Sequence, residues 1–168
     1  MTLLISDANI LIDMESAELL PVLFKLPMDI GIPDILYHEE IQPASPNLEA
    51  LGLHIMELTG EFIAYAFDLT ARHNNKLSSK QGARPSHNDY IALALAKQEQ
   101  ATLLTGDAAL RIVAQREKVQ VMGSIGLMQH FLQYELVSKD ECRCALEKMK
   151  VAKRRLPWTD AENMIRQF

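Results

Sequence analysis

Four carboxylates in this chain each stand beside a short apolar stretch, where their side chains could share a ligand. Asp7, Glu40 and Asp107 follow such stretches, and Asp89 opens one. A carboxylate just past the C-terminal end of a buried parallel strand lies in the crevice where open α/β sheets bind ligands. We therefore expect the four side chains to meet in one acidic pocket.

A pocket of this kind favours a divalent metal ion. Two carboxylates about 4 Å apart repel by roughly 4 kcal/mol at an effective dielectric of about 20, so four of them need cations to stay ionised. Oxygen ligands suit Mg²⁺ or Mn²⁺, whereas zinc prefers histidine or cysteine. One or two such ions at a phosphodiester would polarise a phosphoryl oxygen, lower the pKa of an attacking water and stabilise the leaving oxygen. The sequence thus predicts phosphodiester hydrolysis.

Each carboxylate also has a purely structural interpretation. Asp7 could cap the next helix, a common role worth about 1 kcal/mol. Asp89 could be only the last member of a capping box opened by Ser86, and Asp107 could be a turn residue. Glu40 could be a solvated helix residue. The acidic pocket disappears only if all four of these interpretations hold together, and their order in an alternating fold argues against that.

Apolar runs and helical spacing alternate along the chain and predict its elements. Strands are expected at residues 3–6, 30–32, 53–58, 102–104 and 119–122, and helices at 9–24, 34–41, 61–77, 86–98, 108–117 and 125–134. The residues of the helix at 61–77 expected to face inward are Ile63, Phe67 and Leu77. Strands alternating with helices imply a mainly parallel sheet covered on both faces. We predict an α/β fold, a three-layer α/β/α sandwich.

The C-terminal part of the chain is expected to be helical. Capping boxes are expected at Ser138 with Glu141 and at Thr159 with Glu162. With 168 residues, the chain is long enough for one well-buried core and short for two. We predict one domain over residues 1–135 and a helical extension over 136–168 that packs on it.

Composition limits the cellular context and the partners. The chain is 48% hydrophobic with a formal net charge of −5, which argues against broad nonspecific coating of nucleic acid but allows a polynucleotide bound through cations and local basic patches. It begins without a basic leader and has no apolar run of membrane-spanning length, so we expect a cytoplasmic protein that does not enter a membrane. Cys142 and Cys144 lie two apart without a second Cys or His pair, as expected of structural or surface thiols.

Four segments together resemble the successive motifs of the PIN domain family. They are Ser-Asp-Ala-Asn-Ile-Leu-Ile at 6–12, Ile-Pro-Asp-Ile-Leu-Tyr-His-Glu-Glu-Ile at 32–41, Ser-His-Asn-Asp-Tyr-Ile-Ala-Leu-Ala at 86–94 and Leu-Thr-Gly-Asp at 104–107. The resemblance covers roughly the first 130 residues, a typical single-domain span. It implies a compact α/β/α domain with Mg²⁺- or Mn²⁺-dependent ribonuclease activity, often as the toxin of a VapBC-type toxin–antitoxin pair.

The resemblance also implies roles for individual residues. Asp7, Glu40, Asp89 and Asp107 match the metal-site acids of the family, and Asn9 and Thr105 match polar positions that orient a ligand or water. Glu39 beside Glu40 leaves two choices for the second acid; Glu40 precedes the apolar Ile41, as the family pattern requires. The tail, with Arg-Leu-Pro at 155–157, resembles that of a little-characterised prokaryotic PIN subgroup.

Several basic residues could contact an RNA substrate. His87 lies next to the proposed site, and Lys80 and Arg84 belong to a polar segment that either guides an RNA backbone or forms a solvated loop. The dense basic run at 148–155 either binds RNA or a partner or forms a charged helix face. A cognate antitoxin is a further expected partner, and the apolar stretch at 127–136 could serve a homodimer.

Three other classes compete with a nuclease. A phosphorelay receiver requires an early pair of acids and a late lysine, neither of which is present in the expected arrangement. A haloacid-dehalogenase phosphatase requires Asp-x-Asp after its first strand, where this chain has Asp-Ala-Asn at 7–9. The main alternative is a non-catalytic PIN-like module that binds RNA or docks a partner.

Overall fold

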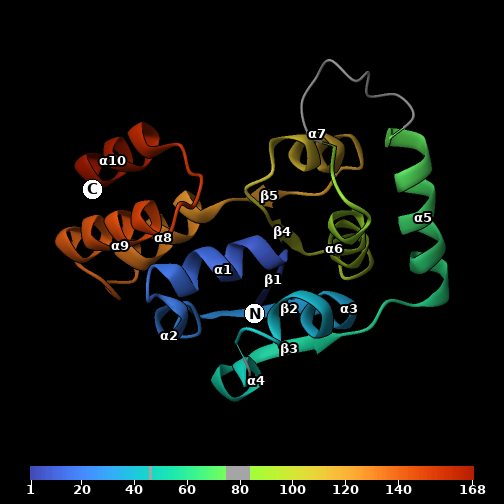
Figure 1. Ribbon diagram of the computed structural model, residues 1–168, viewed down its shortest axis with the longest axis horizontal. Coiled ribbons are helices and arrows are strands. Elements are labelled where there is room, and N and C mark those ends of the chain that lie inside the picture. Colours follow the sequence, from blue (N-terminus) through green and yellow to red (C-terminus); the bar gives the residue numbers. More distant parts are fainter. Residues whose placement is uncertain (46, 75–83) are drawn as a thin grey trace.

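The computed structural model describes residues 1–45, 47–74 and 84–168 and contains a five-stranded, fully parallel sheet (Figure 1). Its strands are β1 (Thr2–Ser6), β2 (Met28–Pro33), β3 (Leu53–Met56), β4 (Thr102–Leu104) and β5 (Val121–Met122). They are arranged in the order β3-β2-β1-β4-β5. All five predicted strands are therefore present, and β3 and β5 are shorter than expected.

Helices cover both faces of this sheet. They are α1 (Ala8–Ser16), α2 (Leu20–Leu23), α3 (Asp34–Leu36), the π-helical turn η1 (Tyr37–Ile41), α4 (Leu48–Leu51), α5 (Gly60–Asn74), α6 (His87–Gln98), α7 (Ala108–Arg116), α8 (Ser124–Gln133), α9 (Lys139–Val151) and α10 (Trp158–Gln167). In Figure 1, α1, α8 and α9 lie on one side of the sheet and α6 lies on the other, with α5 outside α6. The predicted three-layer α/β/α sandwich is confirmed.

The core is densest where α6 lies against the sheet. Seven consecutive residues of α6, from Tyr90 to Ala96, are buried because the sheet covers one side of this helix and α5 covers another. A helix enclosed in this way needs apolar residues all round rather than on one stripe. The buried carboxyl end of α6 thus fixes its amino end, which carries Asp89, over the edge of the sheet.

The helix expected over residues 9–24 is wrong in its length, since the structure has two helices there. α1 ends with Ala17 as its C-cap, and Glu18 adopts a left-handed φ of 58° before α2 begins. Pro21 explains the break, because it has no N–H to donate to a preceding turn and its ring clashes with a continuous helix. The turn also brings the Leu19 N–H to the Met14 carbonyl at 2.7 Å.

The face of α5 that turns inward also differs from the prediction. Ala66, Leu69 and His73 are buried, whereas Ile63 is 43% exposed and Phe67 is 61% exposed. The third residue predicted to face inward, Leu77, lies outside the described residues. The inward spacing of three and four is helical, but the stripe is displaced by one position because α5 packs mainly on α6 rather than on the sheet.

The C-terminal extension contains the two helices expected there. The capping box of α9 is confirmed, with the Glu141 N–H donating to Ser138 Oγ at 3.1 Å and the Ser138 N–H donating to Glu141 Oε2 at 2.6 Å. The second box is wrong, because the N-cap of α10 is Pro157, two residues before Thr159, and makes no side-chain cap. Glu162 instead accepts a hydrogen bond from Arg143 Nε at 3.1 Å, which joins α10 to α9.

The extension packs against α8 and α1 and closes the apolar stretch proposed for dimer formation. Leu127, Met128, Phe131 and Leu132 of α8 are buried within the chain itself. These four side chains are therefore not at the surface, and a homodimer stays a prediction. Of the two cysteines of α9, Cys142 is buried and Cys144 is exposed, and neither forms a disulfide.

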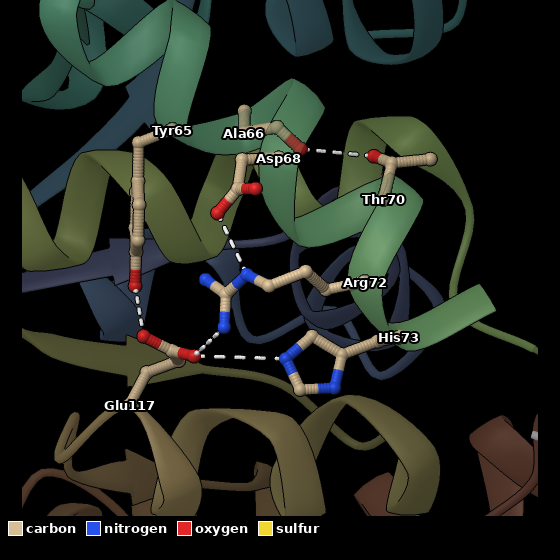
Figure 2. A network of polar contacts seen from close by, with 7 residues as sticks. All are labelled: Tyr65, Ala66, Asp68, Thr70, Arg72, His73 and Glu117. Atoms are coloured by element: carbon tan, nitrogen blue, oxygen red, sulfur yellow. Dashed lines mark hydrogen bonds and ion pairs between the residues drawn. The ribbon is translucent and has the colours of Figure 1, made fainter. Parts of the chain in front are cut away.

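A polar cluster around Glu117 holds α5 against the end of α7 (Figure 2). Glu117 accepts hydrogen bonds from the Tyr65 hydroxyl at 2.7 Å and from Arg72 Nη1 at 3.2 Å, and His73 Nε2 lies 3.6 Å from it. Burial alone would raise the pKa of Glu117, but the Tyr65 hydroxyl and the Arg72 guanidinium outweigh burial and hold this pKa below its ordinary value. Tyr65, Arg72 and His73 thus attach α5 to the end of α7, whereas α5 does not lie on the sheet itself.

No helix within the described ranges is long and apolar enough to cross a lipid bilayer.

Candidate metal centre

The carboxyl ends of β1 and β4 form the point where the order of the sheet reverses. The chain runs from β1 outward to β2 and β3 on one side, and from β4 to β5 on the other. The connections leave these two neighbouring strands in opposite directions, which opens a crevice of the kind in which α/β proteins bind ligands. Asp7 follows β1, and its N–H donates to the Leu104 carbonyl at the end of β4 at 3.0 Å.

Asp7 is the most buried of the candidate acids, with 1% of its surface exposed. It is the N-cap of α1, where its Oδ1 accepts the Ile10 N–H at 2.9 Å. Its Oδ2 is buried and has no hydrogen-bond partner among the described residues. Burial raises the pKa of Asp7 to about 7; contacts with the Thr105 side chain and the Ile10 amide oppose this shift, and the charge of Asp89 adds to it.

Asp107 is held at the same edge by the loop after β4. Its Oδ1 accepts the Leu110 N–H at 2.7 Å and caps α7, while its own N–H donates to Thr105 Oγ1 at 3.1 Å. Thr105 is fully buried between the Asp7 and Asp107 positions. The threonine hydroxyl therefore fixes the backbone that presents Asp107, which agrees with a supporting role for Thr105.

Asp89 lies in the first turn of α6 and completes a capping box with Ser86. Its Oδ2 accepts the Ser86 N–H at 2.7 Å, and its own N–H donates to Ser86 Oγ at 3.2 Å. Burial raises the pKa of Asp89, and the charge of Asp107 adds to that shift. Asp89 therefore caps α6 and also interacts electrostatically with Asp107.

The capping roles expected of Asp7 and Asp89 are confirmed, and Asp107, expected as a turn residue, caps α7; metal binding by these acids stays a prediction. Asp7, Asp89 and Asp107 each use one carboxylate oxygen for a helix N-terminus. An ionised carboxylate has two oxygens and about four lone-pair sites, so each acid keeps an oxygen for another ligand. Capping also fixes the direction of that second oxygen, which is what a rigid ligand site requires.

Glu40 enters the site from η1, a single π-helical turn that continues α3. The Gln42 N–H donates to the Tyr37 carbonyl at 2.8 Å, five residues back, and short π turns of this kind occur often at functional sites. Glu39 accepts a hydrogen bond from Asn88 Nδ2 at 3.0 Å, while burial and the charge of Asp89 raise the pKa of Glu40. The charge of Asp89 therefore acts on Glu40, and the choice between Glu39 and Glu40 as the second acid stays a prediction.

A family model described as a PIN domain matches residues 3–168 of the chain. The chain is a PIN domain protein. The match includes the C-terminal extension, so the helices after residue 135 belong to the pattern shared with the family. PIN domains are generally nucleases and typically use divalent metals. A comparison with curated proteins found no match.

The acids of this PIN domain suit a hard divalent cation, although they do not surround one point closely. Among the described residues, no group of three His, Cys, Asp or Glu side chains is close enough to hold one ion together. Mutual repulsion favours such spreading, since like charges separate when no cation lies between them. The Oδ2 of Asp7 favours a bound cation. It is buried without a hydrogen-bond partner among the described residues, and burying a carboxylate oxygen in this way is costly.

Two residues that support this site were missed from the sequence. Asp13 of α1 is buried, binds Arg154 Nε at 2.6 Å and accepts a hydrogen bond from Ser124 Oγ at 3.1 Å. Arg154 Nη2 reaches Asn9 Oδ1 at 3.3 Å, so the arginine holds the exposed side chain of Asn9 beside the acids. The available signal was the spacing of four between Asn9 and Asp13, which places both on one face of a helix.

The three candidate substrate contacts have different surroundings. His87 Nδ1 lies 2.9 Å from the Thr70 hydroxyl and the imidazole lies against the Phe67 ring, with 4.5 Å between ring centroids. These contacts hold the imidazole toward α5 rather than toward the acids. Arg84 is exposed just before α6, and Lys80 lies outside the described residues. A role for these three in RNA binding stays a prediction.

Proposed function

We propose that this PIN domain is a metal-dependent endoribonuclease that hydrolyses RNA phosphodiester bonds. Asp7, Glu40, Asp89 and Asp107 would hold one or two Mg²⁺ or Mn²⁺ ions. The observation that carries the proposal is the buried Oδ2 of Asp7, which has no hydrogen-bond partner among the residues that the structure describes and lies at the edge where the sheet order reverses. Such an oxygen is best explained by a cation that binds there.

The residues of the chain would divide the work between them. Asp7, capped and deeply buried, would have to be deprotonated to serve as a ligand, since burial raises the pKa of the free carboxyl to about 7. Asp89 and Asp107 present their second oxygens from fixed helix N-termini, and Thr105 keeps Asp107 in place. A bound divalent cation supplies Lewis-acid polarisation of the phosphoryl oxygen and a lowered pKa of the attacking water.

The exposed acid has a different part in this scheme. Glu40 lies on a π turn with its side chain in solvent, so it can adjust as substrate enters. Asn9, held by Arg154, offers an amide that can orient a water or a phosphate oxygen. RNA as the substrate and a toxin role with a cognate antitoxin both belong to this proposal, and a homodimer would have to form without the buried face of α8.

A non-catalytic binding module is the second candidate. It is favoured by the spread of the acids, none of which forms a three-donor group with described neighbours, and by their use as helix caps. In that case the carboxylates would serve the helices alone. The two candidates make different predictions for the removal of one capping carboxylate. In a nuclease the change abolishes RNA cleavage, whereas in a binding module it alters only the stability of the fold.

Cleavage of a structured RNA pool by the purified protein separates the candidates. We expect cutting with Mn²⁺, none with EDTA, and none by the Asp7→Asn variant, whose amide can still cap α1. Asp140→Asn is the matched control, because it removes one charge from the 95% exposed Asp140 in the first turn of α9. Undiminished cutting by Asp7→Asn would refute the assignment of Asp7, and absence of cutting by the wild type would favour the binding module.

A further inference from the structure

The basic run at 148–155 ends in a cavity beside the candidate acids. This cavity has a volume of about 350 Å³ and is lined by Asn9, Asp13, Gly106, Asp107, Lys153, Arg154 and Arg155. Residues from β1–α1, the loop after β4 and the C-terminal extension therefore meet there. Asn9 and Asp107 belong to the candidate metal centre. Lys153, Arg154 and Arg155 line the same cavity and therefore lie next to that centre.

A left-handed turn places these cations in the cavity wall. α9 ends with Ala152 as its C-cap, and Lys153 has a φ of 58°. The Lys153 N–H donates to the Lys150 carbonyl at 2.9 Å, and the Arg154 N–H donates to the Met149 carbonyl at 2.9 Å. Such a turn reverses the direction of the chain after a helix. It turns the end of the basic run away from the helix surface and toward α1.

Arg154 is already occupied within the protein. Its Nε binds Asp13 at 2.6 Å, and its Nη2 reaches the carbonyl of Asn9 at 3.4 Å as well as the Asn9 amide oxygen. Burial raises the pKa of Asp13, and the guanidinium opposes this shift. Arg154 thus acts as an internal clamp that fixes the turn on α1, and its charge largely compensates that of Asp13.

Lys153 and Arg155 on either side of the clamp remain available. Both are exposed, and neither side chain forms a hydrogen bond or an ion pair with a described residue. A second cavity of about 540 Å³ shares Asp13, Gly106 and Arg155 with the first and extends to Arg111. The two cavities therefore adjoin each other, and their lining includes the cations Lys153, Arg155 and Arg111 as well as the acids Asp13, Asp107 and Asp160.

We propose that Lys153 and Arg155 bind an RNA backbone phosphate next to the phosphate held at the acids. This inference rests on the proposed nuclease function and gives the C-terminal extension a direct part in substrate binding. A guanidinium offers a planar fork of donors and an ammonium offers a mobile point charge, a pair suited to a phosphate diester. An RNA strand is favoured over an acidic protein segment because these adjoining cavities open directly on the candidate metal residues.

The test measures RNA binding with and without these two cations. The Lys153→Gln/Arg155→Gln double variant is made in an Asp7→Asn background, so that the strand is not cut, and binding of a fluorescent single-stranded RNA is followed by anisotropy at several salt concentrations. Losing both contacts to this one phosphate should lower the magnitude of the slope of log K against log salt by about 0.7, with a Kd about tenfold higher at moderate salt. Equal melting temperatures of the proteins establish that the fold is kept.

The matched control is Arg116→Gln/Lys118→Gln at the far end of α7. Lys118 has a φ of 60° just after a helix, as Lys153 has, and an arginine again lies two residues away. The same charge is therefore removed in the same local conformation, away from the acids. We expect this control to bind RNA within about twofold of the parent, since two distant charges act only weakly through screened solvent.

The possible results separate the subsite from the nuclease function. If the protein with wild-type Asp7 cuts RNA and the two double variants bind RNA alike, the subsite is refuted while the nuclease function stands. If the protein with wild-type Asp7 does not cut RNA and the Asp7→Asn parent does not bind it, both the nuclease function and the subsite are refuted. Retained RNA binding together with lost binding of a fluorescent polyglutamate peptide would overturn the proposal in favour of an acidic protein partner.

Discussion

Removing the charge of Asp7 is expected to make the metal-free protein more stable. In the folded protein the pKa of this carboxyl is about 7, against an ordinary value of 3.8. The group therefore contributes stability that is fully present below about pH 3.8 and is lost as the pH rises through about 7. The difference between the two pKa values corresponds to about 4 kcal/mol at about 1.36 kcal/mol per pH unit.

The Asp7→Asn variant avoids this loss because its amide stays neutral at every pH. Its Oδ1 can still accept the Ile10 N–H, so the cap of α1 is kept. Linkage predicts that its advantage over the wild type grows from about 1.5 kcal/mol near pH 5 to about 4 kcal/mol near pH 8. For a chain of this size the larger value corresponds to a rise in melting temperature of about 10 °C.

Urea denaturation of both proteins in EDTA measures this difference directly. The pH dependence of the difference isolates Asp7, because every other titrating group is common to the two proteins. Asp140→Asn, in an almost fully exposed position, should follow the wild type throughout. An advantage that is absent near pH 8, or that is the same near pH 5 and near pH 8, would refute the reasoning from a buried, unpaired carboxylate.

Three further predictions concern the metal, the clamp and the packing of α5. Mn²⁺ at one hundred times its Kd should stabilise the wild type by about 2.7 kcal/mol and leave Asp7→Asn nearly unchanged in thermal denaturation; an equal shift in both would place the ion elsewhere. Arg154→Met should lower the free energy of unfolding by about 3 kcal/mol, because the buried Asp13 loses its partner, and a urea midpoint like that of the wild type would contradict the clamp. Leu69→Ala should cost about 3 kcal/mol and Phe67→Ala less than about 1 kcal/mol in the same assay; the reverse order would contradict the observed face of α5.

The sheet and the position of the acids could be predicted from the sequence because both depend on local patterns. Short apolar runs such as Leu103–Leu104 are typical of strands buried on both faces, and acids that follow them must lie at the carboxyl edge of a parallel sheet. The N-terminus of α6 was equally clear, since Ser86 and Asp89 form their capping box within four residues. The role of these acids in binding metal stays a prediction.

The errors arise where distant parts of the chain decide the outcome. The inward face of α5 is set by its packing against α6. The spacing of apolar residues within α5 does not show which helix will cover it. Thr159 and Glu162 have the spacing of a capping box, but Arg143 of α9 competes for the glutamate. The pair of Asp13 and Arg154 joins residues 141 positions apart, so the sequence marks each of them only as a charged residue.

Anomalous diffraction from crystals of the protein soaked in Mn²⁺ tests the central claim most directly. The account predicts a manganese peak at coordination distance from Asp7 Oδ2, with further oxygens from the other acids at the edge between β1 and β4. The peak should be lost in Asp7→Asn crystals and kept in Asp140→Asn crystals. Manganese bound elsewhere, or a vacant Asp7 oxygen in a protein that cuts RNA with Mn²⁺, would contradict the account.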